Sequence, residues 1–212
     1  MERFKFLDEN LREALKRTQK IIRRGGVIVC PTDTVYGLIA DAKSEKAVTK
    51  VFQIKKRTFN KPIPIFVKDL RMAKGLAIIN KFQEKFLKKV WPGKVTVVLR
   101  AKSKNFPKGI VGKDGKIGLR IPNYKIINQL LLMINSPLTG TSANISEKPE
   151  STKIKEVLKQ FQNQKYQPDL ILDAGNLKPS KPSTAVDLTN FKILREGAIS
   201  KKEILDKIKL CK

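Results

Sequence analysis

The sequence of 212 residues contains no histidine. That absence excludes catalysis by Ser–His–Asp or Cys–His groups, imidazole acid–base chemistry and histidine metal ligands. If the protein is an enzyme, it must work with Lys, Arg, Ser, Thr, Asn and Asp side chains and with backbone amides. Those groups suit reactions that depend on positioning and on stabilisation of developing charge, above all transfer at phosphorus.

Cysteine and aromatic residues are also scarce. The two cysteines, Cys30 and Cys211, lie near opposite ends of the chain in no metal or redox spacing, so neither a disulfide nor a zinc site is expected. Only 7% of the residues are aromatic, which argues against a surface that stacks nucleic-acid bases. Walker and dinucleotide-binding glycine patterns are absent, so a bound nucleotide would need another scheme.

Long hydrophobic runs are missing as well. No apolar run approaches the ~20 residues that span a bilayer, and residues 1–6 contain no apolar signal core. We therefore expect a cytoplasmic protein without membrane contact. The length and the hydrophobic content of 41% indicate a single domain over residues 1–212 with one sizeable core.

What the chain has in excess is positive charge. Its net charge is +26, from 45 basic and 19 acidic residues. Such a balance is typical of proteins with an anionic partner such as nucleic acid, nucleotide or phosphate. However, 35 of the basic residues are Lys and only 10 are Arg. Because Arg is the residue that forks onto phosphate, the Lys excess is equally consistent with a solvated surface.

Hydrophobic periodicity predicts helices and strands that intermix without strict alternation. Helices are expected over 11–22, from Ser44 to residue 55, twice within 69–90, over 123–132 and 152–161, and from Ser200 to residue 208. Strands are expected at 27–29, 62–67, 95–99, 117–121, 137–141, 170–172, 185–188 and 192–194. The pattern favours an α/β fold with a twisted, mixed, mostly parallel sheet and flanking helices.

Polar side chains gather where the first predicted strand ends. The stretch Pro31–Leu38 begins with a proline that cannot donate to a strand ladder, followed by Thr32, Asp33, Thr34 and Tyr36. In open α/β sheets ligands bind at such strand ends. An ordinary turn, in which Thr32 or Asp33 caps backbone groups, fits the same residues.

Two further polar clusters have two interpretations each. Lys55, Arg57 and Lys61 surround a predicted helix end, where they could hold a triphosphate or form a solvated basic cap. The stretch 139–146 follows a strand and is rich in small hydrogen-bonding groups, as in an anion nest or in a turn with an N-cap. Arg120 lies among apolar residues and is expected to have a fixed partner. Whether Arg195 has a fixed partner is the corresponding question for the last strand.

Together these stretches resemble the YrdC family of L-threonylcarbamoyladenylate synthases. The matching blocks occur in family order: Pro31–Leu38, Lys55 with Arg57 and Lys61-Pro62, Trp91-Pro92-Gly93, Arg120-Ile121-Pro122, Thr141-Ser142-Ala143-Asn144, Ser183-Thr184 with Asp187, and Leu194-Arg195 with Gly197. One block alone would carry little weight, but seven in order make a specific signal.

The resemblance implies a reaction and a fold. The family condenses L-threonine, bicarbonate and ATP, with magnesium, into threonylcarbamoyl-adenylate and pyrophosphate. A separate transferase complex then moves the threonylcarbamoyl group onto adenosine beside the anticodon of certain tRNAs. The implied fold is a twisted sheet with a concave, positively charged face, which also allows weak tRNA binding.

The resemblance also assigns roles to individual residues. Positions that hold threonine correspond to Thr34, Tyr36, Arg120 and Ser183. Positions that contact ATP correspond to Arg57, Lys61, Ser142, Asn144 and Arg195. Charge stabilisation during catalysis falls to Lys55, Arg57 and Lys61. Phe66 and Lys116 align with ligand-contacting positions whose residue type varies.

The chain departs from the family pattern in three places. Glu147 replaces a frequent glycine after Ser146, with Glu150 close by, and an acidic residue near phosphates is unfavourable unless it faces solvent or magnesium. Lys94 replaces a frequent proline. The chain ends soon after Gly197, so the second domain of longer members is expected to be absent. Residues 101–116 are the candidate for a loop that closes over the site.

Two alternatives remain open. A carbamoyltransferase module of the hydrogenase-maturation type also handles ATP and a carbamoyl group, but it normally sits in a much larger chain. An RNA-binding module would account for the net charge of +26, although it would need more aromatic residues.

Overall fold

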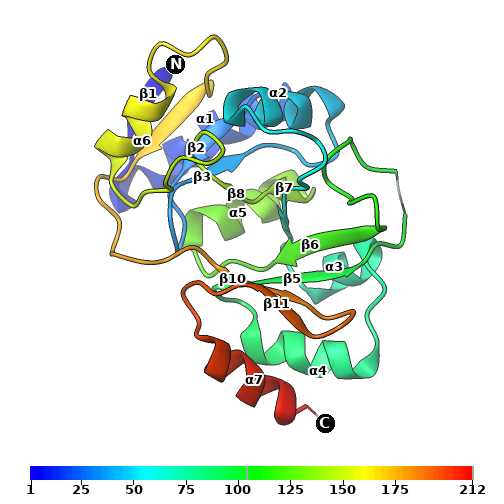
Figure 1. Cartoon of the computed structure of the whole chain (residues 1–212). Helices are drawn as coiled ribbons and strands as arrows, with labels where there is room; N and C mark the ends of the chain where they lie inside the picture. The colour runs from blue at the N-terminus through cyan, green and yellow to red at the C-terminus, as the bar shows by residue number, and fades with distance from the viewer. Residues whose placement is uncertain (104, 212) are drawn as a thin grey trace.

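Two β-sheets form the framework of the computed structural model, which describes residues 1–103 and 105–211 and only the backbone of Asp8 (Figure 1). The five-stranded sheet consists, in spatial order, of β1 (Glu2–Lys5), β9 (Leu170–Asp173), β2 (Ile28–Cys30), β3 (Gly37–Ile39) and β8 (Thr141–Ser142). The six-stranded sheet consists of β11 (Lys192–Arg195), β10 (Thr184–Asp187), β5 (Val95–Arg100), β6 (Lys116–Arg120), β4 (Ile65–Phe66) and β7 (Leu138–Thr139).

Seven α-helices and one 3-10 helix lie among the described residues. They are η1 (Asp8–Asn10), α1 (Leu11–Arg23), α2 (Glu45–Lys55), α3 (Leu70–Leu76), α4 (Lys81–Val90), α5 (Lys125–Ile134), α6 (Ile154–Phe161) and α7 (Lys201–Lys209). Within 1–103 and 105–211, none of these helices combines the length and apolar character needed to cross a bilayer.

The five-stranded sheet is covered by helices on both faces. Because side chains alternate along a strand, Val27 and Val29 face one core while Ile28 and Cys30 face the other. The first core contains α2 and α6, and the second contains α1 and α5. Burial on both faces explains why the run 27–30 is apolar throughout.

The six-stranded sheet is covered differently. In β5, Val95, Val97 and Leu99 join the core that includes α4 and α7, which lie along one side of the strands β5, β10 and β11 (Figure 1). Thr96 and Val98, which point the opposite way, instead line a cavity. One face of this sheet is thus free to bind a ligand.

Gly140 connects the two sheets. It lies between β7 of one sheet and β8 of the other, and its backbone N–H donates to the carbonyl of Pro64 at 2.8 Å. A Cβ atom at this position would lie 2.6 Å from Cε1 of Phe66, which is far inside contact distance. Only glycine therefore lets the chain pass so closely over the Phe66 ring.

Most of the expected elements are confirmed. Ser44 caps α2 through the N–H of Ala47, and Ser200 and Glu203 form the expected capping box of α7. The mixed α/β architecture is confirmed too, but it is divided into two sheets. Both sheets contain parallel and antiparallel pairs, so parallel pairing does not dominate.

The strands differ from expectation in four places. The single strand expected at 137–141 is divided at Gly140 into β7 of one sheet and β8 of the other. β1 was not expected, because it is an edge strand with mostly exposed residues and shows no apolar pattern. β3 was not expected either, since Gly37 and Leu38, its first two residues, belong to the polar stretch Pro31–Leu38. The strand expected at 62–67 is reduced to Ile65–Phe66, because Pro62 and Pro64 have no N–H to donate.

Candidate active site

The stretch Pro31–Leu38 forms both a turn and a cavity wall. The hydroxyl of Thr32 accepts from the N–H of Thr34 at 3.1 Å and donates to the carbonyl of Val35 at 2.6 Å. These local bonds are those of an ordinary turn. Thr32 and Thr34 nevertheless line a small polar cavity of about 120 Å³, called here the small cavity. The stretch is therefore both an ordinary turn and part of a cavity wall.

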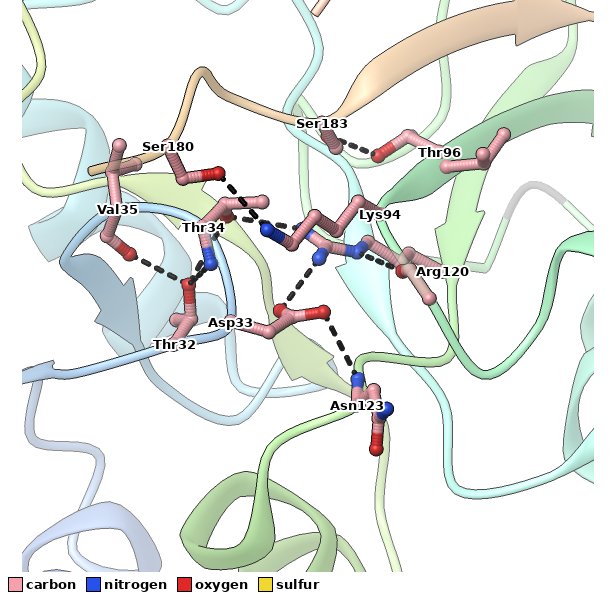
Figure 2. A network of polar contacts seen from close by, with 12 residues as sticks. Thr32, Asp33, Thr34, Val35, Lys94, Thr96, Arg120, Asn123, Ser180 and Ser183 are labelled. Carbon is pink, nitrogen blue, oxygen red and sulfur yellow. Dashed lines mark hydrogen bonds and ion pairs between the residues drawn. The ribbon is translucent and has the colours of Figure 1, made fainter. Parts of the chain in front are cut away.

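All four residues expected to hold threonine border the small cavity: Thr34, Tyr36, Arg120 and Ser183. They come from the segment between β2 and β3, from β6 and from the residue before β10, so only the tertiary fold brings them together. Figure 2 shows this neighbourhood with its hydrogen bonds.

Arg120 is almost fully buried, with a side-chain exposure of 3%. Its Nε donates to the carbonyl of Gly93 at 2.8 Å, and its Nη2 donates to Oδ1 of Asp33 at 2.6 Å. Its Nη1 has a long contact of 3.4 Å with the hydroxyl of Thr34. Burial lowers the pKa of the guanidinium, and Asp33 opposes that effect.

Ser183 is held by two partners. Its hydroxyl lies 2.8 Å from the hydroxyl of Thr96, and its carbonyl accepts two bonds from the guanidinium of Arg195, at 3.2 and 2.8 Å. Thr96 was missed in the sequence, although a polar residue inside the apolar strand 95–99 was a signal that could have been used.

Tyr36 contributes to the wall in a different way from Thr34. Its hydroxyl donates to the carbonyl of Gly175 at 2.7 Å and accepts from the N–H of Ala174 at 3.1 Å. Burial raises the pKa of this hydroxyl above its usual value. The tyrosine thus connects the cavity wall to the segment after β9.

The 142–150 loop, with the C-terminal end of α2, surrounds a second cavity of about 520 Å³, called here the loop cavity. Five predicted residues line it: Lys55, Arg57, Ser142, Asn144 and Arg195. Lys61 does not border it, but its ammonium lies 3.5 Å from Oε1 of Glu147, which does.

Lys55 is buried beneath this loop. Its ammonium donates to the carbonyl of Ser142 at 2.7 Å and to the carbonyl and side-chain oxygen of Asn144 at 2.9 and 2.8 Å. Burial and the charge of Arg57 lower the pKa of Lys55 to about 7, against an opposing effect of Glu150. Because three bonds go to protein oxygens, Lys55 supports the loop as well as supplying charge.

Arg57 is half-buried between the small cavity and the loop cavity. It donates from Nε to the carbonyl of Lys61 at 2.7 Å and from Nη2 to that of Pro62 at 3.2 Å. Burial, followed by the charge of Arg195, lowers the pKa of its guanidinium. Two cations held close together in this way favour an anionic ligand.

A third cavity, called here the large cavity, has a volume of about 570 Å³ and lies on the free face of the six-stranded sheet. Apolar residues, among them Pro64, Val98 and Leu194, line much of it. At its edge the ammonium of Lys116 lies 2.7 Å from Oδ2 of Asp187. Such a mixture of apolar walls and few polar groups is typical of small-molecule sites.

Arg195 borders the small, the loop and the large cavity. A ligand that occupied all three would therefore pass this guanidinium. Phe66, which also borders the small cavity, lies beneath Arg120, whose Cζ is 5.7 Å from the ring centre.

The fit of a magnesium ion depends on its oxygen ligands. Across 1–103 and 105–211, no group of three or more His, Cys, Asp or Glu residues could hold a metal ion. Glu147 and Glu150 border the loop cavity and are exposed. A magnesium ion carried on the phosphates of a nucleotide would need only one or two protein carboxylates, which is the usual arrangement for this ion, and Glu147 and Glu150 are the carboxylates at this cavity.

The departures from the family pattern lie at the rim of the site. Glu147 adopts a φ of 70°, a conformation that favours glycine, and its side chain is 85% exposed, so it faces solvent. The ammonium of Lys94 lies 3.2 Å from the hydroxyl of Ser180. In the loop 101–116, residue 104 lies outside the described residues, whereas Gly112, Lys113 and Asp114 line the large cavity.

Comparisons with known proteins identify the family of this chain. A model of the Sua5, YciO and YrdC proteins, described as telomere recombination, matches residues 20–197. A relative from Methanocaldococcus jannaschii, provisionally named a threonylcarbamoyl-AMP synthase, is 41% identical over 198 residues, which are 91% of this chain and 89% of the relative.

Two matches come from Pyrococcus abyssi. Its threonylcarbamoyl-AMP synthase is 34% identical over 86% of this chain and 54% of its own length, so the chain spans about half of that protein. The crystal structure of Sua5 complexed with L-threonine superposes with a TM-score of 0.84 at 32% identity, covering 98% of this chain and 59% of that one. Because the family model matches most of its length, the chain belongs to the Sua5/YciO/YrdC family.

Proposed function

We propose that the protein condenses L-threonine, bicarbonate and ATP into threonylcarbamoyl-adenylate and releases pyrophosphate. The observation that carries this proposal is the position of Arg195, which borders the small, the loop and the large cavity. An adenylate-forming enzyme needs three adjoining subsites, for an acid, a nucleoside and a polyphosphate. The names of the relatives and the threonine in the Pyrococcus abyssi structure support the choice of substrates.

The small cavity is the proposed threonine site. Its volume of about 120 Å³ suits a small amino acid, and Thr34 and Ser183 offer hydroxyl groups. Arg120 offers a cationic nitrogen, Nη1, for the carboxylate of threonine. Because Arg120 already gives Nε and Nη2 to protein oxygens, it binds this carboxylate through one nitrogen rather than as an open fork.

The large cavity is the proposed nucleoside site, and the loop cavity is the proposed polyphosphate site. Apolar walls at Pro64, Val98 and Leu194 suit a purine ring. Arg57, Ser142 and the other groups of the loop cavity suit anionic oxygens. The α-phosphate then lies beside Arg195, next to the amino acid.

The chemistry follows from this placement. The amine of threonine combines with bicarbonate, and a water molecule leaves as the carbamate forms. A carbamate oxygen attacks the α-phosphorus, and the bond from that phosphorus to the β-phosphate oxygen breaks, which releases pyrophosphate. Negative charge builds on phosphoryl oxygens, so cations held in advance around them stabilise the transition state.

Two cations at the loop cavity have this role in our proposal, Arg57 and Arg195, and Lys61 would reach the phosphates from outside the cavity, where it now pairs with Glu147. Lys55 adds its charge from beneath the loop and fixes Ser142 and Asn144. Magnesium bound to the phosphates would neutralise further charge. None of these steps requires a histidine, in agreement with its absence from the chain.

The product has a mixed anhydride of carbamic and phosphoric acids and serves as an activated acyl donor. We propose that it is passed to a threonylcarbamoyl transferase complex that modifies adenosine next to the anticodon of tRNA. The net charge of +26 is consistent with weak attraction of tRNA to the protein.

One assay tests the proposal. The protein is incubated with threonine, bicarbonate, magnesium and α-labelled ATP, and pyrophosphate and labelled adenylate are measured. We expect both products, and both should disappear when threonine or bicarbonate is omitted. Folded protein that releases no threonine-dependent pyrophosphate would overturn the proposal, and threonine-independent carbamoyl transfer would favour the hydrogenase-maturation alternative.

A further inference from the structure

We infer that Asp33 is a positioning residue for recognition of the amino acid, acting through Arg120. This inference rests on the proposed function, because it assigns the carboxylate of the substrate to Arg120. Asp33 orients the guanidinium so that Nη1 is directed toward Thr34 and the small cavity. Asp33 is not among the described residues that line the small cavity, so it acts on the substrate only through Arg120.

The guanidinium of Arg120 is fixed on two of its three nitrogens. Nε donates to the carbonyl of Gly93 at 2.8 Å, and Nη2 donates to Asp33 at 2.6 Å. Nη1 has the hydroxyl of Thr34 at 3.4 Å, which is a weak contact. A carboxylate that enters the small cavity therefore meets Nη1, the nitrogen whose N–H groups are least engaged by protein oxygens.

Asp33 is itself fixed on both oxygens. Oδ1 accepts from Arg120, and Oδ2 accepts from the backbone N–H of Asn123 at 3.1 Å (Figure 2). Asn123 lies between β6 and α5, so Asp33 connects the turn after β2 to the chain that follows Arg120. Both ends of the ion pair are thereby tied to the backbone.

The charges require this pairing. The side chains of Arg120 and Asp33 are 3% and 8% exposed, and a buried cation without a partner is costly. Asp33 compensates Arg120 before the ligand arrives. When a carboxylate binds, the second negative charge is balanced by Arg57 and Arg195, which border the same cavity. Without the negative charge of Asp33, Arg120 would lose its counter-ion, and one of the two bonds that orient its guanidinium would weaken.

The test is the isosteric change Asp33→Asn, with KM for threonine and KM for ATP measured separately. We expect KM for threonine to rise at least about 10-fold, KM for ATP to change by less than about 2-fold, and the rate at saturating threonine to fall little. A purely structural role of Asp33 would change both KM values or neither of them.

Asp169→Asn is the matched control. Asp169 also binds a cation through one oxygen, Lys50 at 2.5 Å, and a backbone N–H through the other, that of Val27 at 2.7 Å, but Val27 precedes β2 whereas Asp33 follows it. We expect both KM values to stay within about 2-fold of the wild type, since no interaction with the substrate is lost.

A second variant covers the case in which Asp33→Asn does not fold. Asp33→Glu keeps the charge but moves it by one methylene, and we expect a rise in KM for threonine of about 3- to 10-fold with KM for ATP unchanged. Unchanged KM for threonine in either folded variant, or equal rises in both constants, overturns the inference. Wild-type protein without threonine-dependent turnover overturns the proposed function instead.

Discussion

Lys55 donates to both oxygens of Asn144, the carbonyl at 2.9 Å and the side-chain oxygen at 2.8 Å. The two residues are 89 positions apart in the chain. With the third bond, to Ser142, this ammonium joins the end of α2 to the loop that follows β8. A single buried charge thus shapes the wall of the loop cavity.

The lowered pKa of Lys55 leads to a prediction for ATP binding. Burial lowers the pKa of Lys55 to about 7, so near neutral pH part of the free protein carries Lys55 as the neutral amine, which can donate only two of the three hydrogen bonds. Bound phosphates favour the charged form and raise this pKa, so ATP binding should take up about one proton at most. Affinity for ATP should accordingly fall as the pH rises through 7.

Calorimetric titrations in two buffers of different ionisation heat measure this uptake. In Lys55→Met the uptake should vanish, because the methionine carries no titratable group. Uptake of the same size in Lys55→Met would assign the proton to another residue.

Arg57→Ala should slow turnover by on the order of 100- to 1000-fold, because a preorganised donor to the phosphoryl oxygens is lost. Folding should survive, since the guanidinium of Arg57 bonds, within the described part of the chain, to the loop carbonyls of Lys61 and Pro62, and alanine keeps the backbone bond to Phe52. Steady-state pyrophosphate release and a thermal melt test both statements. Arg71→Ala, on the exposed face of α3, is the control and should leave the rate unchanged. A rate near wild type in Arg57→Ala would rule out a role in phosphate binding.

Gly140→Ala should destabilise the protein by about 1–3 kcal/mol, because its Cβ would meet the Phe66 ring at 2.6 Å. The free energy of unfolding from denaturant titration is the measurement. Gly75→Ala is the contrasting control, since nothing lies within 4 Å of a Cβ there and the helix α3 should gain up to about 1 kcal/mol. Phe66→Leu combined with Gly140→Ala should recover part of the loss; a loss that stays complete would place the clash elsewhere.

Thr18→Val should stabilise the protein by about 1 kcal/mol. Thr18 is fully buried in α1, and its hydroxyl has no hydrogen-bond partner within the described part of the chain. Thr139→Val provides the opposite case, because the hydroxyl of Thr139 bonds to the N–H of Ala40 and the carbonyl of Leu38. There we expect a loss of about 1–3 kcal/mol. Melting curves show whether each change raises or lowers the stability of the protein. A Thr18→Val variant less stable than the wild type would show that the hydroxyl of Thr18 has a hydrogen-bond partner.

Much of the fold could be predicted because its causes are local. Ser44 and Ser200 start helices through bonds to residues three positions away, and the apolar run 27–29 identifies a buried strand wherever it occurs. The strands β1 and β3 could not be predicted in the same way. Their partners supply the hydrogen bonds, and those partners are distant in sequence or lie across a turn.

The candidate site shows the same division at the level of side chains. The sequence by itself determined that histidine chemistry is excluded, that the cations cluster near residues 55–61, and which polar blocks resemble the family. Lys55 and Arg57 look alike in that cluster. In the structure, Lys56 adopts a left-handed conformation with φ 50°, and it separates Lys55, which is buried, from Arg57, which borders two cavities.

Only the tertiary structure decided which partners these charges have. Asp33 lies 87 positions from Arg120, and Ser142 lies 87 positions from Lys55, so no local pattern reveals either contact. A buried charge is tolerated only where folding delivers its counter-ion or its hydrogen-bond acceptors. The sequence therefore determined which groups are available for chemistry, and the packing of the two sheets decided which of them meet, because each pairing depends on backbone segments brought together from distant parts of the chain.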